Sequence, residues 1–486
     1  MLLEATATTQ TIVREISADL ETPISVYMKL RGDGASFLLE SVEGGERIAR
    51  YSFIGVHPKA QYIIRGNNIE IKDANGVRTT QYNGDPTYFL QEEMSRFKFT
   101  PQPGVPRFIG GMVGYLGYES VRFFEPTLKP RMEPRLTSHA TRPTPDGIYL
   151  LADTIVAFDH ARRSLSLIAN VLDGDVDSAN RKLDEIESRI HQPLPQAQPR
   201  DVKSSKTRSN MTQGQFEDMV RDAKEHIAAG DIFQVVLSQR FTRETNVEPF
   251  DVYRAVRRLN PSPYMFFFDF GIVDGEPLFI VGSSPEIFVR LEGRTASLRP
   301  IAGTRPRGAD AEADAALAQE LLADPKERAE HVMLVDLGRN DLGRVCEYGT
   351  VKVSDFFTIE KYSHVMHIVS HVEGKLRPDL TAFDLVRASF PAGTVSGAPK
   401  VRALEIISDL EPDPRGGYAG MIGYFGFDGN MDTCLAIRTL VGRGSTFTVQ
   451  AGAGIVADSN PNTEYQETVN KASAMLRAIE IAETNS

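Results

Sequence analysis

The sequence predicts an α+β protein in which helices pack on the outside of mixed β-sheets. Strand-like and helix-like segments are both abundant, but they do not alternate regularly, which disfavours a doubly wound parallel sheet. Of the 486 residues, 41% are hydrophobic and 39 are glycine. This composition is globular rather than disordered. At about 150 residues per domain, the length corresponds to roughly three domains, or to two larger ones.

Charge and cysteine content restrict the class of function. The chain has 65 acidic and 54 basic residues, a formal charge of −11. That balance argues against sequence-independent nucleic-acid binding, which needs a basic surface. Cys346 and Cys434 are far apart, so we expect no disulfide framework. We identify no signal peptide and no apolar stretch of about 18 residues, so we expect a cytoplasmic protein without a membrane span.

Residues 191–210 have the composition of a linker. They contain three prolines and a short basic run, without hydrophobic periodicity. We therefore expect a β-rich N-terminal region at 1–190 and a larger mixed region at 211–486. In the first region, apolar runs bounded by turn residues predict strands at 147–157 and 164–171.

In the second region, periodicity distinguishes helices from strands. Residues 215–229 have apolar positions at helical spacing and are followed by Gly230, a common helix terminator. Further helices are predicted at 311–324, 326–338, 399–409 and 463–483. Strands are predicted at 232–241, 278–291, 363–373, 432–442 and 446–451.

Two predicted helices each begin with a pair of acidic residues on an inward face. Glu327 and Glu330 precede an apolar stripe, and Glu464 and Glu467 precede Lys471 in the same way. The first pair could simply favour the helix dipole, and the second could form an ordinary glutamate–lysine pair on a solvated face. Two such helices together make a Mg²⁺ site more plausible, because Mg²⁺ prefers carboxylate oxygens and often bridges to an anionic substrate.

Two glycine-rich segments could hold an anion. Thr394 lies between Gly393 and Gly397, just before a predicted helix, and residues 452–454 follow a predicted strand. Tight turns that need glycine are the alternative explanation. Residues 452–457 also match a dinucleotide-binding pattern, but no helix opens there and the chain soon ends, so we reject that interpretation.

Histidine and arginine add possible chemistry. His364, His367 and His371 would share one face of a helix, as zinc ligands can, but their β-branched surroundings favour a strand. One inward histidine then remains available for proton transfer. In the predicted strand 432–442, alternation places Arg438 on an otherwise apolar face with Cys434, where it needs a carboxylate from a ligand or from a structural ion pair.

A series of motifs follows in order along the chain. They are GDIFQVVLSQRF, NPSPYMFFF, GSSPE, RPIAGTRPRG, ERAEHVMLVDLGRND, YSHVMHIVS, FPAGTVSGAPK, RGGYAGMIGYFG, DTCLAIRT, QAGAGIVADS and EYQETVNKA. In this order the motifs resemble those of the large subunits of anthranilate synthases, within the chorismate-utilising enzyme family. The resemblance covers nearly the whole chain and is most specific from about 230 to 480. It implies large antiparallel or mixed sheets that form a sandwich-like core wrapped by helices.

The resemblance also implies a set of site residues. Magnesium ligands are Glu330, Glu467 and Glu464, with Glu327 beside them as the candidate acid for the leaving hydroxyl. His367 and Thr394 line the reacting ring and support the elimination of pyruvate. Residues implied to bind chorismate are Gly303, Thr304, Tyr418, Arg438, Gly452, Ala453, Gly454, Lys471 and Gln234.

Two positions separate relatives on this scaffold. Water-using relatives carry a lysine base where this chain has Gln234, and aminodeoxychorismate synthases often carry a nucleophilic lysine where it has Ala302. We therefore expect external ammonia as the nucleophile, and the resemblance implies that it attacks C2 of chorismate while the C4 hydroxyl leaves. Aminodeoxychorismate synthase is the alternative enzyme.

Neither cysteine lies at a strand–helix elbow suited to a glutaminase nucleophile. The resemblance therefore implies a separate glutamine amidotransferase subunit, in a heterotetramer of two large and two small subunits. It also implies feedback inhibition by L-tryptophan, to which the region 1–190 contributes. A proline-rich turn that packs the two regions together, or a non-catalytic tryptophan-binding subunit, are the alternatives. The implied regulatory residues are Ser41, Pro263, Tyr264, Met265 and Tyr424.

Overall fold

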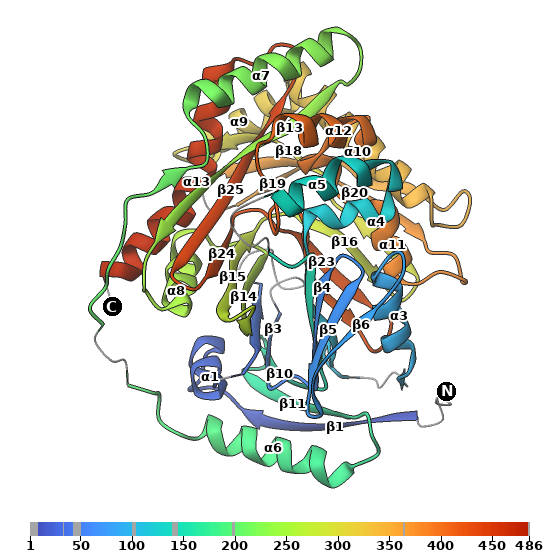
Figure 1. The fold of residues 1–486 in the computed structure, drawn as a ribbon, viewed down its shortest axis with the longest axis vertical. Helices are drawn as coiled ribbons and strands as arrows, with labels where there is room; N and C mark the ends of the chain where they lie inside the picture. Colours follow the sequence, from blue (N-terminus) through green and yellow to red (C-terminus); the bar gives the residue numbers. More distant parts are fainter. Residues whose placement is uncertain are drawn as a thin grey trace.

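A computed structural model of the chain shows two large β-sheets with helices around them (Figure 1). The structure describes residues 8–32, 34–41, 50–99, 104–138, 144–196, 200–362 and 365–484. The predicted α+β class with antiparallel sheets is confirmed. Within the residues that the structure describes, every strand pair is antiparallel except β1–β7, which is parallel. In the described residues no helix combines the length and apolar character needed to cross a membrane.

The first sheet has 13 strands. Twelve of these strands lie side by side in one continuous order, and the remaining strand, β21 (Gly397–Ala398), pairs separately with β13. In spatial order, the path is β12 (Arg208–Ser209), β13 (Gln234–Glu244), β25 (Thr446–Ile455), β24 (Thr439–Arg443), β15 (Glu276–Ser284), β14 (Tyr264–Val273), β2 (Ser36–Glu40), β3 (Tyr51–Val56), β10 (Thr154–Asp159), β11 (Ser164–Val171), β1 (Thr8–Ser17) and β7 (Lys98–Phe99).

The second sheet has 12 strands, and β19 (Lys352–Lys361) pairs with β20 beside its main path. In spatial order, the path is β18 (Ile301–Pro306), β20 (Val365–Lys375), β17 (Thr295–Leu298), β16 (Ile287–Glu292), β23 (Met431–Leu435), β22 (Met421–Gly426), β8 (Gly111–Leu116), β9 (Gly147–Ala152), β4 (Ala60–Arg65), β5 (Asn68–Asp73) and β6 (Gly76–Gln81).

Both sheets contain strands from before and after the 191–210 segment. In the first sheet β14 pairs with β2, so that Phe267 lies opposite Leu38. In the second, β22 pairs with β8, so that Gly423 lies opposite Gly114. The segment itself is largely exposed where it is described and runs along the outside from α6 to α7 (Figure 1). The two regions therefore share their sheets.

Three segments that the sequence predicts as single strands are each two strands in different sheets. Residues 147–157 divide into β9 and β10, residues 278–291 into β15 and β16, and residues 432–442 into β23 and β24. The chain crosses between sheets at Asp153, at Pro285–Glu286 and at 436–438. The prediction that Arg438 shares a strand face with Cys434 is therefore wrong, because Arg438 lies in a bend with φ +48.

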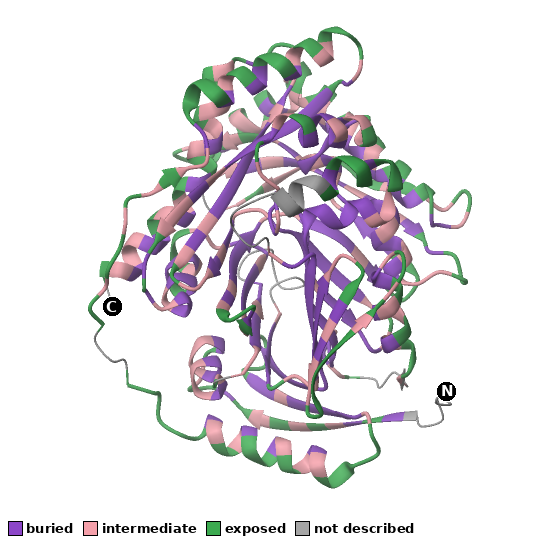
Figure 2. Ribbon diagram, in the orientation of Figure 1, coloured by how far each residue is buried: buried purple, intermediate pink, exposed green. Residues whose placement is uncertain are grey.

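The helices lie mainly on the outside of the sheets, where they show alternating buried and exposed residues (Figure 2). The predicted helices after residue 211 are confirmed as α7, α9, α10, α12 and α13, and α10 extends five residues further than predicted. Helix α7 begins with a capping box in which Thr212 and Gln215 exchange hydrogen bonds. The helices are α1 (Pro23–Leu30), α3 (Thr87–Ser95), α4 (Val121–Phe124), α5 (Lys129–Ser138), α6 (Val176–Ile190), α7 (Gln213–Ala228), α8 (Pro249–Leu259), α9 (Ala311–Ala323), α10 (Pro325–Gly343), α11 (Ala382–Ser389), α12 (Lys400–Leu410) and α13 (Pro461–Thr484).

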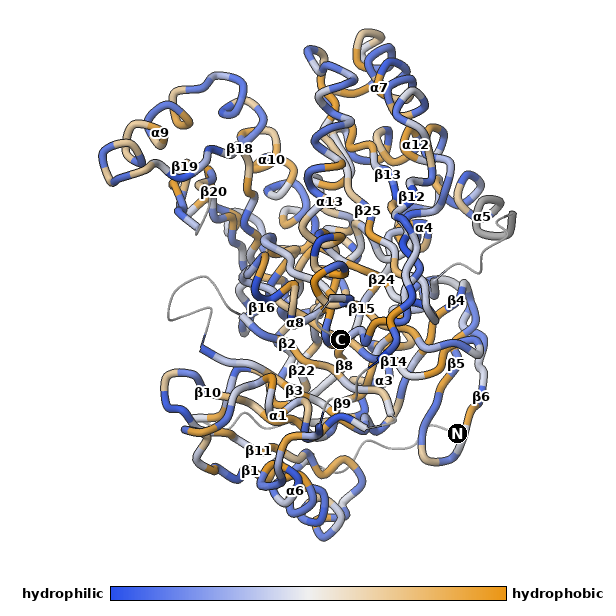
Figure 3. Tube along the Cα trace, turned by 90° about the vertical axis from the view of Figure 1, so that its left-hand side faces the viewer, coloured by the Kyte–Doolittle hydropathy of each residue, from blue (hydrophilic) through white to orange (hydrophobic). Residues whose placement is uncertain are grey.

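The upper part of the molecule has two sides. In Figure 3, α9, β19 and the ends of β18 and β20 project on one side, and α7 and α12 lie on the other. The projection has a small core of its own, formed by Leu321, Met366 and Ile368. Larger clusters of buried side chains occupy the rest of the molecule. Helix α10, which carries the first acidic pair, borders the projection.

Candidate active site

The acidic residues of α10 and α13 influence one another electrostatically. Asp324 caps α10 and accepts hydrogen bonds from the amides of Lys326 (2.9 Å) and Glu327 (3.3 Å). Burial raises the pKa of Glu330, and the negative charges of Glu327 and Glu467 raise it further. Burial also raises the pKa of Glu464, again with a contribution from Glu467. A helix dipole alone explains the first-turn positions but not this mutual repulsion.

The acidic residues of α10 and α13 suit a metal ion that also keeps water or substrate oxygens as ligands. Among the described residues, no three His, Cys, Asp or Glu side chains lie close enough together to hold a metal ion. Mg²⁺ needs only one or two protein carboxylates when water and substrate oxygens complete its octahedron. Glu330, which accepts a hydrogen bond from Gln234 Nε2 (3.2 Å), and Glu467 could fill that role. The donor set therefore fits Mg²⁺ bound together with an anionic substrate.

His367 is oriented by the adjacent strand β18. Its Nδ1 lies 2.9 Å from the carbonyl oxygen of Gly303 and 3.2 Å from Thr304 Oγ1. A carbonyl can only accept, so Nδ1 carries the proton and Nε2 of the neutral ring is a free base. Burial lowers the pKa of His367. The zinc arrangement is not supported within the described residues, where His371 pairs with Glu373 at 3.4 Å; His364 lies outside the described residues.

Gly303 allows a carboxylate to approach the backbone of β18. Its φ is +66, and a Cβ there would lie 3.1 Å from Glu327 Oε2. A larger residue would be strained and would displace this carboxylate. Glu327 also accepts a hydrogen bond from Arg305 Nη1 (3.3 Å). Glu327 therefore lies close to Gly303, which also binds His367, but it already has Arg305 as a cationic partner.

The 452–454 segment lies within β25, not after a strand as the sequence suggested. Gly452 lies opposite Ser238 and Gly454 opposite Val236. The amides of Val236 and Ser238 donate to Ser396 O (2.9 Å) and Glu411 Oε1 (2.8 Å) instead of to β25. Both pairs are therefore of the non-hydrogen-bonded type, and the amides of Gly452 and Gly454 point away from β13.

The residue between the two glycines behaves differently. By the same alternation, Ala453 exchanges hydrogen bonds with Leu237 and offers no donor to a ligand. The carbonyl of Gly452 accepts from Lys471 Nζ (3.1 Å), and a Cβ on Gly452 would lie 2.6 Å from the Tyr418 hydroxyl. Gly452 thus brings Tyr418 and Lys471 to the same point of β25.

Glu286 is a site residue that the sequence analysis did not identify. It lies at the crossing between β15 and β16, and its Oε1 accepts a hydrogen bond from Thr394 Oγ1 (2.8 Å). Burial raises the pKa of Glu286 to about 7, although Lys471 and Arg438 act in the opposite direction. The available signal was a Pro–Glu pair inside the apolar run 278–291, where a solvated acid is not expected.

Arg438 is a cation without a carboxylate partner among the described residues. Burial lowers its pKa, with an opposing contribution from Glu286. Lys400, by contrast, which follows the glycine-rich Thr394 segment, pairs with Asp341 Oδ1 (2.8 Å). The structural ion pair considered for Arg438 is therefore absent from the described chain, whereas Lys400 has one.

A cavity of about 570 Å³ contains only some of the predicted active-site residues in its lining, namely His367, Arg438, Glu467 and Lys471. Its size lies within the range of small-molecule pockets, about 300 to 1,000 Å³. Lys471 and Glu467 form an ion pair (2.6 Å) at its partly exposed side. The lining includes His367, Arg438, Glu467, Lys471, Pro263, Tyr362 and Asn470.

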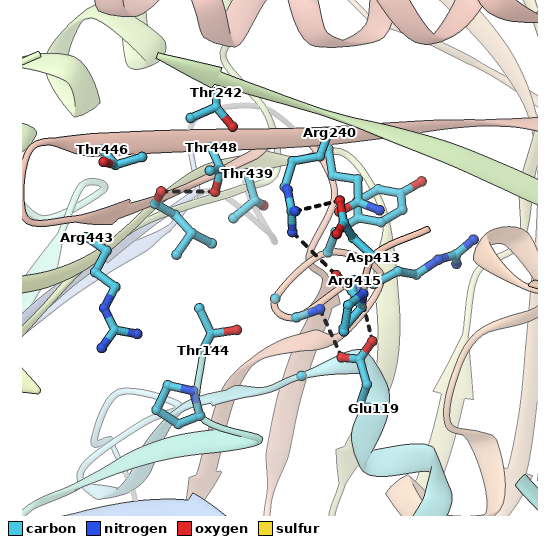
Figure 4. A pocket seen from close by; sticks show the side chains of 18 of the residues that line it. Glu119, Thr144, Arg240, Thr242, Asp413, Arg415, Thr439, Arg443, Thr446 and Thr448 are labelled. Atoms are coloured by element: carbon cyan, nitrogen blue, oxygen red, sulfur yellow. Dashed lines mark hydrogen bonds and ion pairs between the residues drawn. The ribbon is translucent and has the colours of Figure 1, made fainter. Parts of the chain in front are cut away.

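Tyr418 is not in that lining and instead lines a second cavity of about 580 Å³ (Figure 4). Its cations are compensated: Arg240 pairs with Asp413 (2.8 Å) and Arg443 with Asp274 (3.1 Å). Threonine hydroxyls from β13, β24 and β25 complete much of the wall. The cavity that contains Arg438 is therefore the better site for a dianionic ligand.

The five residues implied to form a regulatory site meet around a third cavity. Ser41, Pro263, Tyr264, Met265 and Tyr424 all line it. Its volume is only about 40 Å³, room for a few water molecules at most, since one water needs about 10–15 Å³ on this measure. The pocket as it stands is therefore too small for an indole ring.

Comparison with known proteins gives a consistent result. The family model described as chorismate binding enzyme matches residues 34–477. Anthranilate synthase component 1 from Pseudomonas aeruginosa is 45% identical over 478 residues, 96% of this chain and 95% of that protein. The protein of the same name from Neisseria gonorrhoeae is 46% identical over 480 residues, 97% of this chain and 95% of that protein.

Solved structures extend the comparison. The crystal structure of anthranilate synthase component I from Streptococcus pneumoniae has a TM-score of 0.77 and 37% identity, covering 95% of this chain and 98% of that chain. The menaquinone-specific isochorismate synthase from Escherichia coli shares the fold, with a TM-score of 0.70 and 19% identity, covering 97% of this chain and 95% of that chain. Together with the site geometry, these similarities show that the chain is an enzyme of the chorismate-binding family.

Proposed function

We propose that the chain is the large subunit of an Mg²⁺-dependent anthranilate synthase, which converts chorismate and ammonia to anthranilate and pyruvate. One observation carries this proposal: Arg438, which has no carboxylate partner among the described residues, shares a cavity with Glu467 and Lys471. Two carboxyls with raised pKa values, Glu286 and Glu330, interact electrostatically with these cavity residues. A dianionic substrate and a divalent cation would satisfy both sets of groups. The names of the relatives agree with this chemistry.

The residues divide the binding work by charge. Arg438 and the amides of Gly452 and Gly454 bind carboxylate oxygens of chorismate, and the Tyr418 hydroxyl lies beside them. Mg²⁺, held by Glu330 and Glu467 with Glu464 nearby, would supply an electrophilic contact for a substrate carboxylate. Lys471 compensates the charge of Glu467 and keeps Gly452 in place. Gln234 orients Glu330 through its amide.

Glu286 is a better candidate than Glu327 for the acid that protonates the leaving C4 hydroxyl. Its pKa of about 7 leaves it substantially protonated near neutral pH, and Thr394 fixes its orientation. Glu327 already accepts a hydrogen bond from Arg305. After ammonia adds at C2, Nε2 of His367 accepts the ring proton as pyruvate leaves.

The ammonia source and the inhibitor are further parts of the proposal. Gln234 and Ala302 supply neither a lysine base nor a lysine nucleophile, so ammonia comes from outside, from a glutamine amidotransferase subunit in a heterotetramer of two large and two small subunits in the cytoplasm. L-Tryptophan binds the third cavity, the one lined by Ser41, which we call the Ser41 pocket. Polar atoms there lack partners among the described residues: Ser41 Oγ, Glu40 Oε1 and Arg107 Nε. Groups of both charges suit the zwitterionic end of an amino acid.

The test is a fluorescence assay of the purified chain with chorismate, Mg²⁺ and ammonium, without glutamine. Anthranilate should form, EDTA should abolish it, and L-tryptophan should inhibit it. Consumption of chorismate without anthranilate would favour aminodeoxychorismate synthase. Tryptophan binding that is insensitive to EDTA, without turnover, would favour a regulatory subunit.

A further inference from the structure

Arg415 is a fully buried cation three residues before Tyr418. Its side chain is 1% exposed and forms an ion pair of 2.6 Å with Glu411, whose side chain is 2% exposed. Glu411 Oε1 also accepts hydrogen bonds from the amide (2.8 Å) and hydroxyl (2.7 Å) of Ser238 on β13. The charge is therefore held on one side by α12 and β13, close to the strand pair that carries Gly452.

The other donors of Arg415 reach backbone next to the site. Nη1 donates to the carbonyl of Val395 (2.8 Å), directly after Thr394. Nη2 donates to the carbonyl of Val236 (2.7 Å), two residues after Gln234. The guanidinium carbon lies 5.5 Å from the centre of the Tyr418 ring. One planar group thus binds two separate segments, each of which carries a site residue, and lies beside Tyr418 on its own loop.

The region before residue 190 holds the Arg415 loop from the opposite side. Glu119 accepts hydrogen bonds from the amides of Arg415 (2.6 Å) and Gly416 (2.9 Å), as Figure 4 shows. The Tyr118 ring lies 4.6 Å from the guanidinium carbon. Glu119 is itself buried. The N-terminal region therefore holds the loop that leads to Tyr418, in addition to lining the Ser41 pocket.

We propose that Arg415, held by Glu119 and Glu411, is a positioning residue that fixes Thr394, Gln234 and Tyr418 relative to one another. The inference rests on the proposed function, because it assigns a role in that reaction. A buried ion pair can often be replaced by apolar residues without loss of stability. What an apolar residue or a lysine cannot reproduce is a planar fork that donates to both carbonyls and the carboxylate at once.

The experiment compares two variants of the full chain in the ammonium-dependent assay. Arg415→Lys keeps the charge but loses the fork. The double variant Arg415→Met/Glu411→Gln leaves no unpaired buried charge, and its amide still accepts from Ser238, so it guards against misfolding of the first. We expect kcat to fall at least tenfold in both, with a smaller change in the KM for chorismate, because Arg438 and the glycine amides are untouched.

Arg243→Lys is the matched control. Arg243 lies at the far end of β13, is 13% exposed and pairs with Glu483 (2.5 Å), so its replacement perturbs a similar ion pair away from the site. We expect its kcat to stay within twofold of the wild type. Folded Arg415 variants with wild-type kcat would overturn the inference, as would an increase in KM alone. A wild-type chain that forms no anthranilate would instead contradict the proposed function.

Discussion

The cavity lined by Arg438, which we call the catalytic cavity, differs from the Ser41 pocket in whether its charged side chains have partners of opposite charge. In the cavity, Arg438 has no carboxylate partner among the described residues. Burial raises the pKa of Glu286, which interacts electrostatically with Arg438, to about 7. Around the pocket, Asp432 accepts hydrogen bonds from the Tyr264 hydroxyl (3.0 Å) and Arg290 Nη2 (2.9 Å). The cavity has space and uncompensated charge, whereas the pocket has paired charge and little space.

This difference indicates two kinds of binding. A charged substrate gains affinity in the cavity because it compensates groups that the fold leaves unpaired. A ligand of the Ser41 pocket must first separate packed side chains, such as the Phe108 and Tyr424 rings, which stack at 4.1 Å. Binding there is therefore coupled to a change of conformation, which is the physical requirement for an effector site.

The largest expected effect is on Glu286. Glu286→Gln removes the proposed proton donor while preserving shape, so kcat should fall by about 10² to 10⁴. Glu292→Gln, at the exposed end of β16, is the control and should leave kcat unchanged. The same substitution at Glu327 should cost less than at Glu286. A greater loss of kcat in Glu327→Gln would indicate that Glu327 is the acid after all. It would also show that the absence of a cationic partner does not identify the carboxyl that donates the proton.

Replacement of Arg438 tests whether the unpaired cation binds substrate. Arg438→Gln should reduce kcat/KM for chorismate about 10- to 100-fold, the range expected for one charge-assisted hydrogen bond of about 1.5–3 kcal/mol. Steady-state kinetics with ammonium measure it, and Arg443→Gln in the second cavity is the control. An equal loss in the two variants would mean that compensated and uncompensated cations contribute alike, which contradicts the comparison.

Ser41→Arg tests the packed pocket. The larger side chain should occupy the space that L-tryptophan needs, so the concentration for half inhibition should rise at least tenfold while kcat changes less than twofold. Thr79→Arg on the exposed strand β6 controls for added charge. Unchanged sensitivity to tryptophan would place the inhibitor elsewhere.

Much of the fold was predictable from sequence, but the crossings between sheets were not. Hydrophobic periodicity located the helices and most strands, since it reports which side chains are buried. It cannot report that an apolar run leaves one sheet and enters another, because both halves remain buried. Two of these crossings hold Glu286 and Arg438, so the same gap hid one site residue and gave the other a wrong orientation.

The site residues that sequence did locate had a different signal. The acids of α10 and α13 break an apolar stripe, and the glycines at 303, 452 and 454 occur where a side chain would collide with a site group. Each was visible as an exception to a local pattern. Arg415 gave no such exception, because two of its partners, the carbonyls of Val395 and Val236, come from separate segments that only the folded chain brings to the Arg415–Glu411 pair.

The smallest expected effect concerns stability and follows from the uncompensated charge of Glu286. Its pKa is raised from 4.5 to about 7 in the folded state, so ionisation above the unfolded value favours the unfolded chain. Wild-type stability should therefore fall as pH rises from 4.5 to about 7 and then level off with respect to this group. Glu286→Gln lacks this loss, so its melting temperature should exceed that of the wild type by a few degrees at pH 8 and by less at pH 5. Thermal denaturation of both proteins without ligands measures the difference. If Glu286→Gln is less stable than the wild type at pH 8, the hydrogen bond from Thr394 already stabilises the buried carboxylate. Buried charge would then destabilise the region around Arg438 no more than it destabilises the Ser41 pocket.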